Sequence, residues 1–148
     1  MARLQARCVK RECCFSDIYK KALAALEGDA EGAEELVASL VKDRFVDDLR
    51  YASAFAREKS RLGGWGPAKI RFALRGKGIS AEVIEEALGE VDQEDADRKM
   101  LSVLSMKAKS LEGDTRKKSK LLRFGLGRGY SYEALSSAVA DILSGSEE

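Results

Sequence analysis

The sequence predicts an all-α protein, a tandem array of three three-helix repeats that form an elongated, curved rod. Three observations support this prediction. Stretches of the chain align at a constant offset of 51 residues, apolar residues recur at helical spacing, and no strand alternation of useful length occurs. A period near 50 residues is typical of helical arrays whose repeats bury their faces against neighbours. We place the repeats at 1–42, 43–92 and 93–143, followed by a disordered tail over 144–148.

The first repeat is the weakest copy, because it lacks the glycine and the basic pair that precede the second helix elsewhere. Its helices are predicted over 2–13, 15–26 and 29–42. We interpret three cysteines, Cys8, Cys13 and Cys14, as small core-facing residues of the first helix. Their odd number and the lack of a fourth ligand at zinc spacing favour reduced thiols over a metal site.

The second repeat has the clearest signals for where its helices begin and end. Its helices are predicted over 49–60, 67–77 and 81–91. Asp47 and Asp48 can cap the first, since carboxylates accept hydrogen bonds from the free N–H groups of a helix start. Pro67 suits a first helical turn, where its missing N–H costs no hydrogen bond. Gly78 suits the left-handed position that ends the second helix, and Ser80 can cap the third.

The third repeat follows the same plan with one departure. Its helices are predicted over 95–111, 115–127 and 131–143. Gly125 stands where the second repeat has the core residue Leu74, which costs about 1 kcal/mol of helix propensity relative to alanine and some packing. A slight rotation of the helix would let Leu126 compensate.

Aromatic residues are predicted to serve packing more than binding. Trp65 would dock under the following helix, and the alternative is an exposed anchor for a partner. Four others are expected to pack between repeats: Phe45, Tyr51, Phe55 and Phe72. A series of aromatic platforms interleaved with basic residues, which single-strand binders need, is not apparent.

Composition excludes most enzymatic chemistry. The chain has 148 residues, 34% of them charged and 45% apolar, and it has no histidine. The commonest general base and metal ligand are therefore missing, and the glycine-rich stretches lack a phosphate-loop pattern. We expect no catalysis, cofactor, metal or small-molecule substrate. No apolar run reaches the roughly 18 residues that cross a membrane and no secretion signal is visible, so we expect a cytoplasmic protein without a membrane partner.

Charge is segregated along the chain although the net charge is only +1. Basic residues dominate 57–77 and 98–128, whereas 27–35 and 82–97 are acidic. Helix dipoles explain acidic helix starts, but they do not explain a basic start such as Arg116 to Lys118. The pattern favours one basic and one acidic side, with the basic side binding nucleic-acid phosphate or an acidic protein surface. The candidate contact residues are Arg57, Arg61, Lys69, Arg71, Arg75, Lys77, Arg116, Lys117, Lys118, Lys120, Arg123 and Arg128.

The second repeat contains a set of characteristic motifs: the run from Phe45 to Ala52, Phe55, the Gly-Trp-Gly-Pro stretch ending at Pro67, Lys69, Ile70, Leu74 and the run from Lys77 to Ser80. These motifs resemble those of the RecX family, the bacterial regulators of the RecA recombinase. The end of the chain, from Lys120 to Ser131, is similar to the family's final repeat, and Arg11, Glu12, Ser16 and Ile18 echo its opening signature. The departures are Gly125, Leu49 and the atypical first repeat.

The resemblance implies a non-enzymatic regulator made of three-helix repeats. Such proteins bind along the groove of the RecA–DNA filament and restrain its ATP turnover, strand exchange and coprotease activity toward the LexA repressor, mostly as inhibitors. The alternative is a helical module that binds single- or double-stranded DNA directly, without RecA. A purely structural scaffold is a third possibility, although it leaves the basic helix start unexplained.

Overall fold

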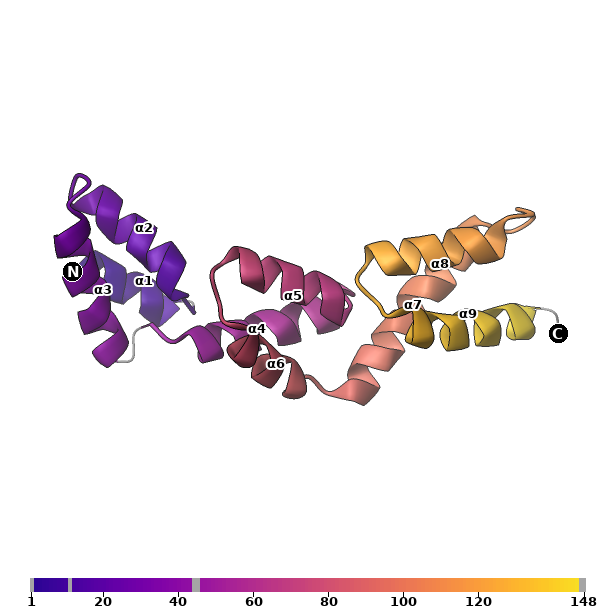
Figure 1. The fold of residues 1–148 in the computed structure, drawn as a ribbon. Helices are drawn as coiled ribbons and strands as arrows, with labels where there is room; N and C mark the ends of the chain where they lie inside the picture. Colours follow the sequence, from indigo (N-terminus) through magenta and orange to yellow (C-terminus); the bar gives the residue numbers. More distant parts are fainter. Residues whose placement is uncertain (1, 11, 44–45, 147–148) are drawn as a thin grey trace. The chain divides into compact units, whose positions relative to one another are not determined.

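The computed structural model describes residues 2–10, 12–43 and 46–146, and all regular structure in these ranges is α-helical (Figure 1). The helices are α1 Ala2–Lys10, α2 Phe15–Ala25, α3 Ala30–Lys42, α4 Asp48–Arg61, α5 Pro67–Gly76, α6 Ala81–Gly89, α7 Gln93–Ser110, α8 Lys117–Gly127 and α9 Tyr132–Ser146. This all-helical structure confirms the predicted all-α fold class. None of the helices in the described ranges is both long and apolar enough to cross a bilayer.

Contacts within the chain define two compact units that do not coincide with the repeats. Unit 1 comprises Met1–Phe55 and Ala73–Gly89, and unit 2 comprises Ala56–Phe72 and Glu90–Glu148. Helices α4 and α5 therefore contribute residues to both units. The repeat boundaries remain a sequence prediction, because the contacts divide the middle repeat between the two units.

The capping residues explain where several helices begin. Asp29, Asp47, Ser80 and Ser131 each accept a hydrogen bond from the backbone N–H three residues later, at 3.0 to 3.3 Å. Such a bond satisfies one of the N–H groups that a helix start leaves free. Three of these positions, Asp29, Ser80 and Ser131, are spaced by the predicted offset of 51 residues. Asp48, which we also predicted as a cap of α4, instead accepts a hydrogen bond from the N–H of Phe15.

Two helix ends differ from the sequence prediction. Helix α1 ends at Lys10, so Cys13 and Cys14 lie in the irregular segment before α2 rather than in the first helix. The thiols of Cys13 and Cys14 are nevertheless buried, because this segment covers the core. Helix α9 runs to Ser146, so the first three residues of the predicted disordered tail are helical, and the last two lie outside the described residues.

The core of unit 1 includes two of the three cysteines. Cys8 and Cys13 are buried together with Ile18, Val37 and Leu40. The pKa of the Cys8 thiol is raised to about 12. Burial is the main cause, and a hydrogen bond and a charge interaction with Cys13 also contribute. None of the three cysteines forms a disulfide with another described residue.

The raised pKa of Cys8 predicts a loss of stability at alkaline pH. The folded thiol stays protonated above pH 9.0, its ordinary pKa, whereas the unfolded thiol ionises there. The stabilisation is therefore complete below pH 9.0 and is lost as the pH rises toward about 12. Denaturant unfolding of the wild type and of Cys8→Ala measures it, because titrating groups that do not interact with Cys8 contribute equally to both proteins. A difference that does not change with pH would contradict this expectation.

The core of unit 2 explains why a glycine, Gly125, stands inside a helix of the third repeat. A Cβ on Gly125 would lie 2.1 Å from the Cδ2 atom of Leu135. Leu135 of α9 therefore occupies the space that a side chain at position 125 would fill, and both residues are buried. The expected compensation by Leu126 is wrong, since that side chain is 50% exposed.

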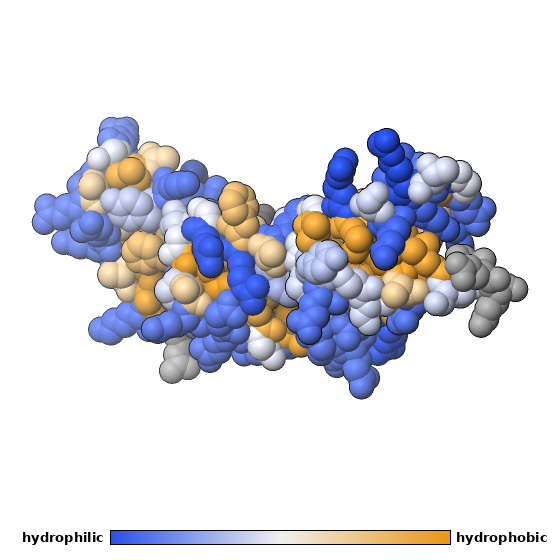
Figure 2. Space-filling model, turned by 45° about the vertical axis from the view of Figure 1, so that its right-hand side comes forward, coloured by the Kyte–Doolittle hydropathy of each residue, from blue (hydrophilic) through white to orange (hydrophobic). Residues whose placement is uncertain are grey.

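One aromatic prediction fails. Tyr51 and Phe55 are partly buried and their rings stack, with centroids 6.0 Å apart. Phe72, however, is 80% exposed and does not pack between repeats. Phe45 lies outside the described residues. Figure 2 shows hydrophobic residues at the surface among hydrophilic ones on the face drawn there.

Candidate functional site

The loop between α4 and α5 is held within unit 2 by the turn between α8 and α9. The N–H groups of Gly66 and Ala68 donate to the carbonyls of Arg128 and Gly129, at 2.7 and 3.0 Å. A Cβ on Gly66 would lie 2.3 Å from the carbonyl carbon of Gly129, so only glycine permits this approach. Gly64 has a φ of +65°, a conformation that glycine adopts without strain. The glycines of this loop therefore fix its position against the turn.

Two aromatic residues complete the loop. The buried hydroxyl of Tyr130 donates to the carbonyl of Gly64 at 2.7 Å. Burial raises the pKa of Tyr130 above its ordinary value of 10.0, so this donor stays protonated well above neutral pH. The backbone N–H of Trp65 donates to the carbonyl of Lys59 at 2.9 Å. The partly buried indole ring of Trp65 faces cationic side chains.

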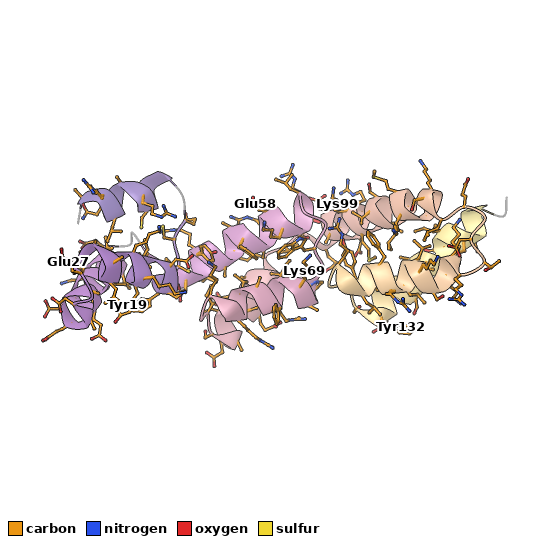
Figure 3. The ribbon with its side chains drawn as sticks, turned by 90° about the horizontal axis from the view of Figure 1, so that it is seen from above. Tyr19, Glu27, Glu58, Lys69, Lys99 and Tyr132 are labelled. Carbon is orange, nitrogen blue, oxygen red and sulfur yellow. The ribbon has the colours of Figure 1, made fainter. Side chains whose placement is uncertain are left out.

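Four basic residues surround this loop, and with Trp65 they form what we call the loop cluster. The ammonium groups of Lys59 and Lys69 lie 5.0 and 4.4 Å from the centre of the Trp65 ring. A Cβ placed on Gly64 would be 3.5 Å from Cε of Lys99 and 3.7 Å from a terminal nitrogen of Arg128. Figure 3 labels Lys69 on α5 and Lys99 on α7. The loop cluster thus draws cations from α4, α5, α7 and the turn after α8.

The loop cluster is electrostatically suited to bind an anion. All five of its side chains are partly buried, where like charges repel each other more than in water. In the described part of the chain, no carboxylate forms an ion pair with Lys69, Lys99 or Arg128, and the buried Nε of Arg128 has no hydrogen-bond partner. The face of Trp65 offsets part of the repulsion through cation–π attraction. A phosphate or carboxylate at this site would offset the remainder.

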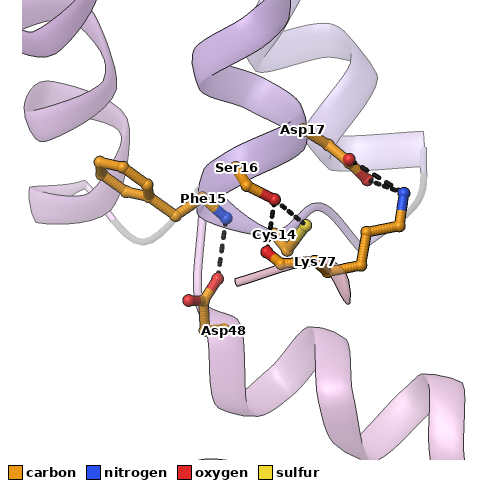
Figure 4. Close-up of polar contacts among 6 residues, drawn as sticks. All are labelled: Cys14, Phe15, Ser16, Asp17, Asp48 and Lys77. Carbon is orange, nitrogen blue, oxygen red and sulfur yellow. Dashed lines mark hydrogen bonds and ion pairs between the residues drawn. The ribbon is translucent and has the colours of Figure 1, made fainter. Parts of the chain in front are cut away.

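A related junction occurs within unit 1 (Figure 4). Ser16, at the start of α2, donates from its hydroxyl to the carbonyl of Lys77, in the turn between α5 and α6. The Lys77 ammonium in turn donates to both oxygens of Asp17, at 3.0 and 3.1 Å. The N–H of Phe15 donates to Asp48 at 2.8 Å. In both junctions the start of a second helix therefore meets the turn before the next repeat's third helix.

The ion pair at this junction changes the pKa of both partners. Burial alone raises the pKa of Asp17, but hydrogen bonds from Lys77 and Cys14 and the Lys77 charge lower it overall. The hydrogen bond to Asp17 is the main cause that raises the pKa of Lys77. Lys77, one of the predicted contact residues, thus has a structural partner within unit 1.

The basic start of α8 has its own compensation. Asp114 accepts a hydrogen bond from the N–H of Arg116 at 2.8 Å and forms an ion pair with Lys120. The hydrogen bond from Lys120, followed by that from the Arg116 backbone, lowers the pKa of Asp114. The helix begins at Lys117, two residues later than predicted, and Arg116 provides no side-chain cap.

The structure places ten of the predicted contact residues in unit 2 and the other two, Arg75 and Lys77, in unit 1. It brings Lys69 and Arg128 together at the loop cluster. The exposed members of unit 2 are Arg57, Arg61, Arg116, Lys118, Lys120 and Arg123, whereas Arg71 and Lys117 are partly buried. Arg57 also lies 3.9 Å from Glu90, a distance at which an exposed pair contributes little.

Sequence reasoning missed three members of the loop cluster, Lys59, Trp65 and Lys99, as contact residues. Lys59 and Lys69 lie on either side of Trp65 in the sequence, which is a weak signal. Lys99 follows Asp48 by 51 residues. Asp48 contacts the first residue of α2, and Lys99 approaches the loop before α5. The offset of 51 residues could have identified Lys99 only if the contact of Asp48 with Phe15 in unit 1 had already been known.

The comparisons with known proteins all indicate the same family. Residues 47–88 match the family model of the second three-helix domain of RecX. The chain is 35% identical over 119 residues to regulatory protein RecX of Clostridium botulinum (strain Eklund 17B / Type B), covering 78% of this chain and 55% of that protein. It is 34% identical over 108 residues to regulatory protein RecX of Escherichia coli (strain SE11), covering 73% and 64%. The chain thus spans little more than half the length of the first of these relatives.

Solved structures show the same fold. The crystal structure of RecX from Lactobacillus salivarius superimposes with a TM-score of 0.78 at 18% identity, covering 95% of each chain. A crystal structure of regulatory protein RecX gives a TM-score of 0.76 at 25% identity, covering 91% of this chain and 69% of that one.

Proposed function

Because this chain belongs to the RecX family, we propose that it regulates RecA, as an inhibitor, by binding along the groove of the RecA–DNA filament. The observation that carries the proposal is the loop cluster, where Lys69, Lys99 and Arg128 converge without carboxylate partners. A filament of protein and DNA offers the phosphates and carboxylates that such a cluster binds.

The exposed predicted cations of unit 2 extend this contact. Arg61, Arg116, Lys118 and Arg123 belong to the same unit as the loop cluster and are open to solvent. Contacts at several points act together at high effective concentration, so individually weak ion pairs suffice for stable attachment. Holding neighbouring RecA protomers at a fixed separation would oppose the subunit motion that ATP turnover requires, which accounts for inhibition without catalysis.

The decisive experiment compares capture of this protein by RecA–DNA filaments, by free RecA and by bare single-stranded DNA. We expect capture by the filament alone, together with a dose-dependent fall in DNA-stimulated RecA ATPase activity. An unchanged ATPase rate at saturating protein would overturn the proposal. Tight binding to bare DNA that weakens steeply with salt would instead support the direct DNA-binding alternative.

A further inference from the structure

We propose that copies of this chain associate head to tail, with the basic start of α8 in one copy docking on the acidic turn between α2 and α3 of the next. The proposal goes beyond the regulation of RecA and does not depend on it. It rests on the junction between the start of a second helix and the turn before a third helix, which occurs once in each unit. It also rests on two further surfaces, one at a helix start and one at a turn.

The junction follows one rule in both units. In unit 1, the start of α2 donates from Ser16 to the carbonyl of Lys77 in the turn before α6. In unit 2, the start of α5 donates from Gly66 and Ala68 to carbonyls in the turn before α9. Each second helix thus docks on the turn that precedes the third helix of the following repeat.

The chain contains one further second-helix start and one further turn. Lys117 stands at the position of Gly66 and Glu27 at that of Gly129, so their contact would follow the junction of unit 1, where Phe15 stands at the position of Gly66. The turn between α2 and α3 has the required backbone, because Glu27 has a φ of 55°, close to the 76° of Gly78 and the 95° of Gly129. These three residues are spaced by 51, and Glu27 is exposed, as Figure 3 shows. Among the described residues, nothing donates a hydrogen bond to the carbonyl of Glu27, whereas the carbonyl of Leu26, at the position of Lys77 and Arg128, accepts one from the N–H of Asp29. The start of α8 likewise forms no hydrogen bond with a turn of another repeat in the described ranges, and the N–H of Lys117 donates to the carbonyl of Asp114.

The two surfaces have opposite charge. The start of α8 carries Arg116, Lys117 and Lys118, has no acidic residue in its first turn and receives no side-chain cap from Arg116. Asp114 pairs with Lys120 but leaves the ammonium groups of Lys117 and Lys118 without a carboxylate in the described structure. Carboxylates near a helix start would offset both the basic side chains and the positive end of the helix dipole.

The acidic surface supplies such carboxylates. Glu27 and Glu31 are exposed and form no ion pair with any described residue. Asp29 between them already caps α3 through the N–H of Gly32. Because the two surfaces differ, the contact is heterologous and each copy can bind one neighbour on either side. The resulting association is open-ended and grows with concentration.

The test uses the full chain and two charge-reversed variants. The acidic-start variant carries Arg116→Glu, Lys117→Glu and Lys118→Glu, and the basic-turn variant carries Glu27→Lys and Glu31→Lys. Sedimentation velocity should show that the average mass of the wild type rises with concentration and falls with added salt. Each variant alone should associate at least tenfold more weakly, because like charges then face each other.

Mixing the two variants should restore association, since an acidic start then meets a basic turn and a basic start meets an acidic turn. Lys20→Glu with Lys21→Glu is the matched control, an exposed pair on α2 whose reversal should leave association unchanged. Far-UV circular dichroism verifies that every variant is folded. A wild type that stays monomeric at all concentrations, a single variant that associates like the wild type, or folded variants that do not associate when mixed would each overturn the proposal.

Discussion

Replacing Gly66 with alanine is expected to lower the free energy of unfolding by about 1–3 kcal/mol, because the added methyl group overpacks a backbone contact. Its Cβ would meet the carbonyl carbon and oxygen of Gly129 and the nitrogen of Tyr130 at 2.3 to 2.4 Å. Backbone atoms cannot move aside as the end of a flexible side chain can, so the α4–α5 loop must leave the turn before α9. Denaturant unfolding followed by the fluorescence of Trp65, the only tryptophan, reports directly on this loop.

The matched controls are Gly76→Ala and Gly127→Ala. Both glycines lie in helices, and a Cβ at either position would have no atom within 4 Å. Alanine there should raise the free energy of unfolding by roughly 0.5–1 kcal/mol through its higher helix propensity. Equal effects at positions 66 and 76 would show that the close backbone approach does not stabilise the junction.

Reversing two cations of the loop cluster, as Lys69→Glu with Lys99→Glu, is expected to weaken binding to RecA–DNA filaments at least tenfold. A tenfold loss corresponds to about 1.4 kcal/mol. Both cations lack carboxylate partners in the described structure, so their reversal removes attraction to the filament without breaking an ion pair. Co-sedimentation of the protein with filaments over a range of concentrations measures the affinity.

Lys20→Glu with Lys21→Glu serves again as the control, because it changes the net charge equally within unit 1. Its affinity for filaments should stay close to that of the wild type. If both double variants lost affinity to the same extent, net charge rather than the loop cluster would govern binding. If neither lost affinity while both remained folded, the loop cluster would not be the contact surface.

Much of the fold was predictable because local chemistry and tertiary structure agree. Asp29, Ser80 and Ser131 cap helices where their side chains suggest, and Pro67 begins α5 as expected. Prediction from the sequence failed where contacts between helices determine the packing. Gly125 appeared to be a packing defect, yet Leu135 fills its space from another helix, which no local pattern reveals.

The candidate site was less predictable than the fold. Charge clustering selected Lys69 and Arg128, which converge, but it also selected Lys77, whose ammonium pairs with Asp17 across 60 residues. Such pairing depends on which helix start meets which turn, and charge counts along the chain contain no such information. Phe72 illustrates the opposite error, because its apolar side chain lies in the open rather than in a core.

The sharing of α4 and α5 between the two units has a consequence for how the chain unfolds. Repeat arrays often lose their modules one at a time, since each module contacts only its neighbours. Here the melting of α4 would remove residues from both cores at once, so the units are expected to unfold together. A fragment that ends between the second and third repeats would retain 56–72 without the rest of unit 2, and would lack the partners that hold the α4–α5 loop in place.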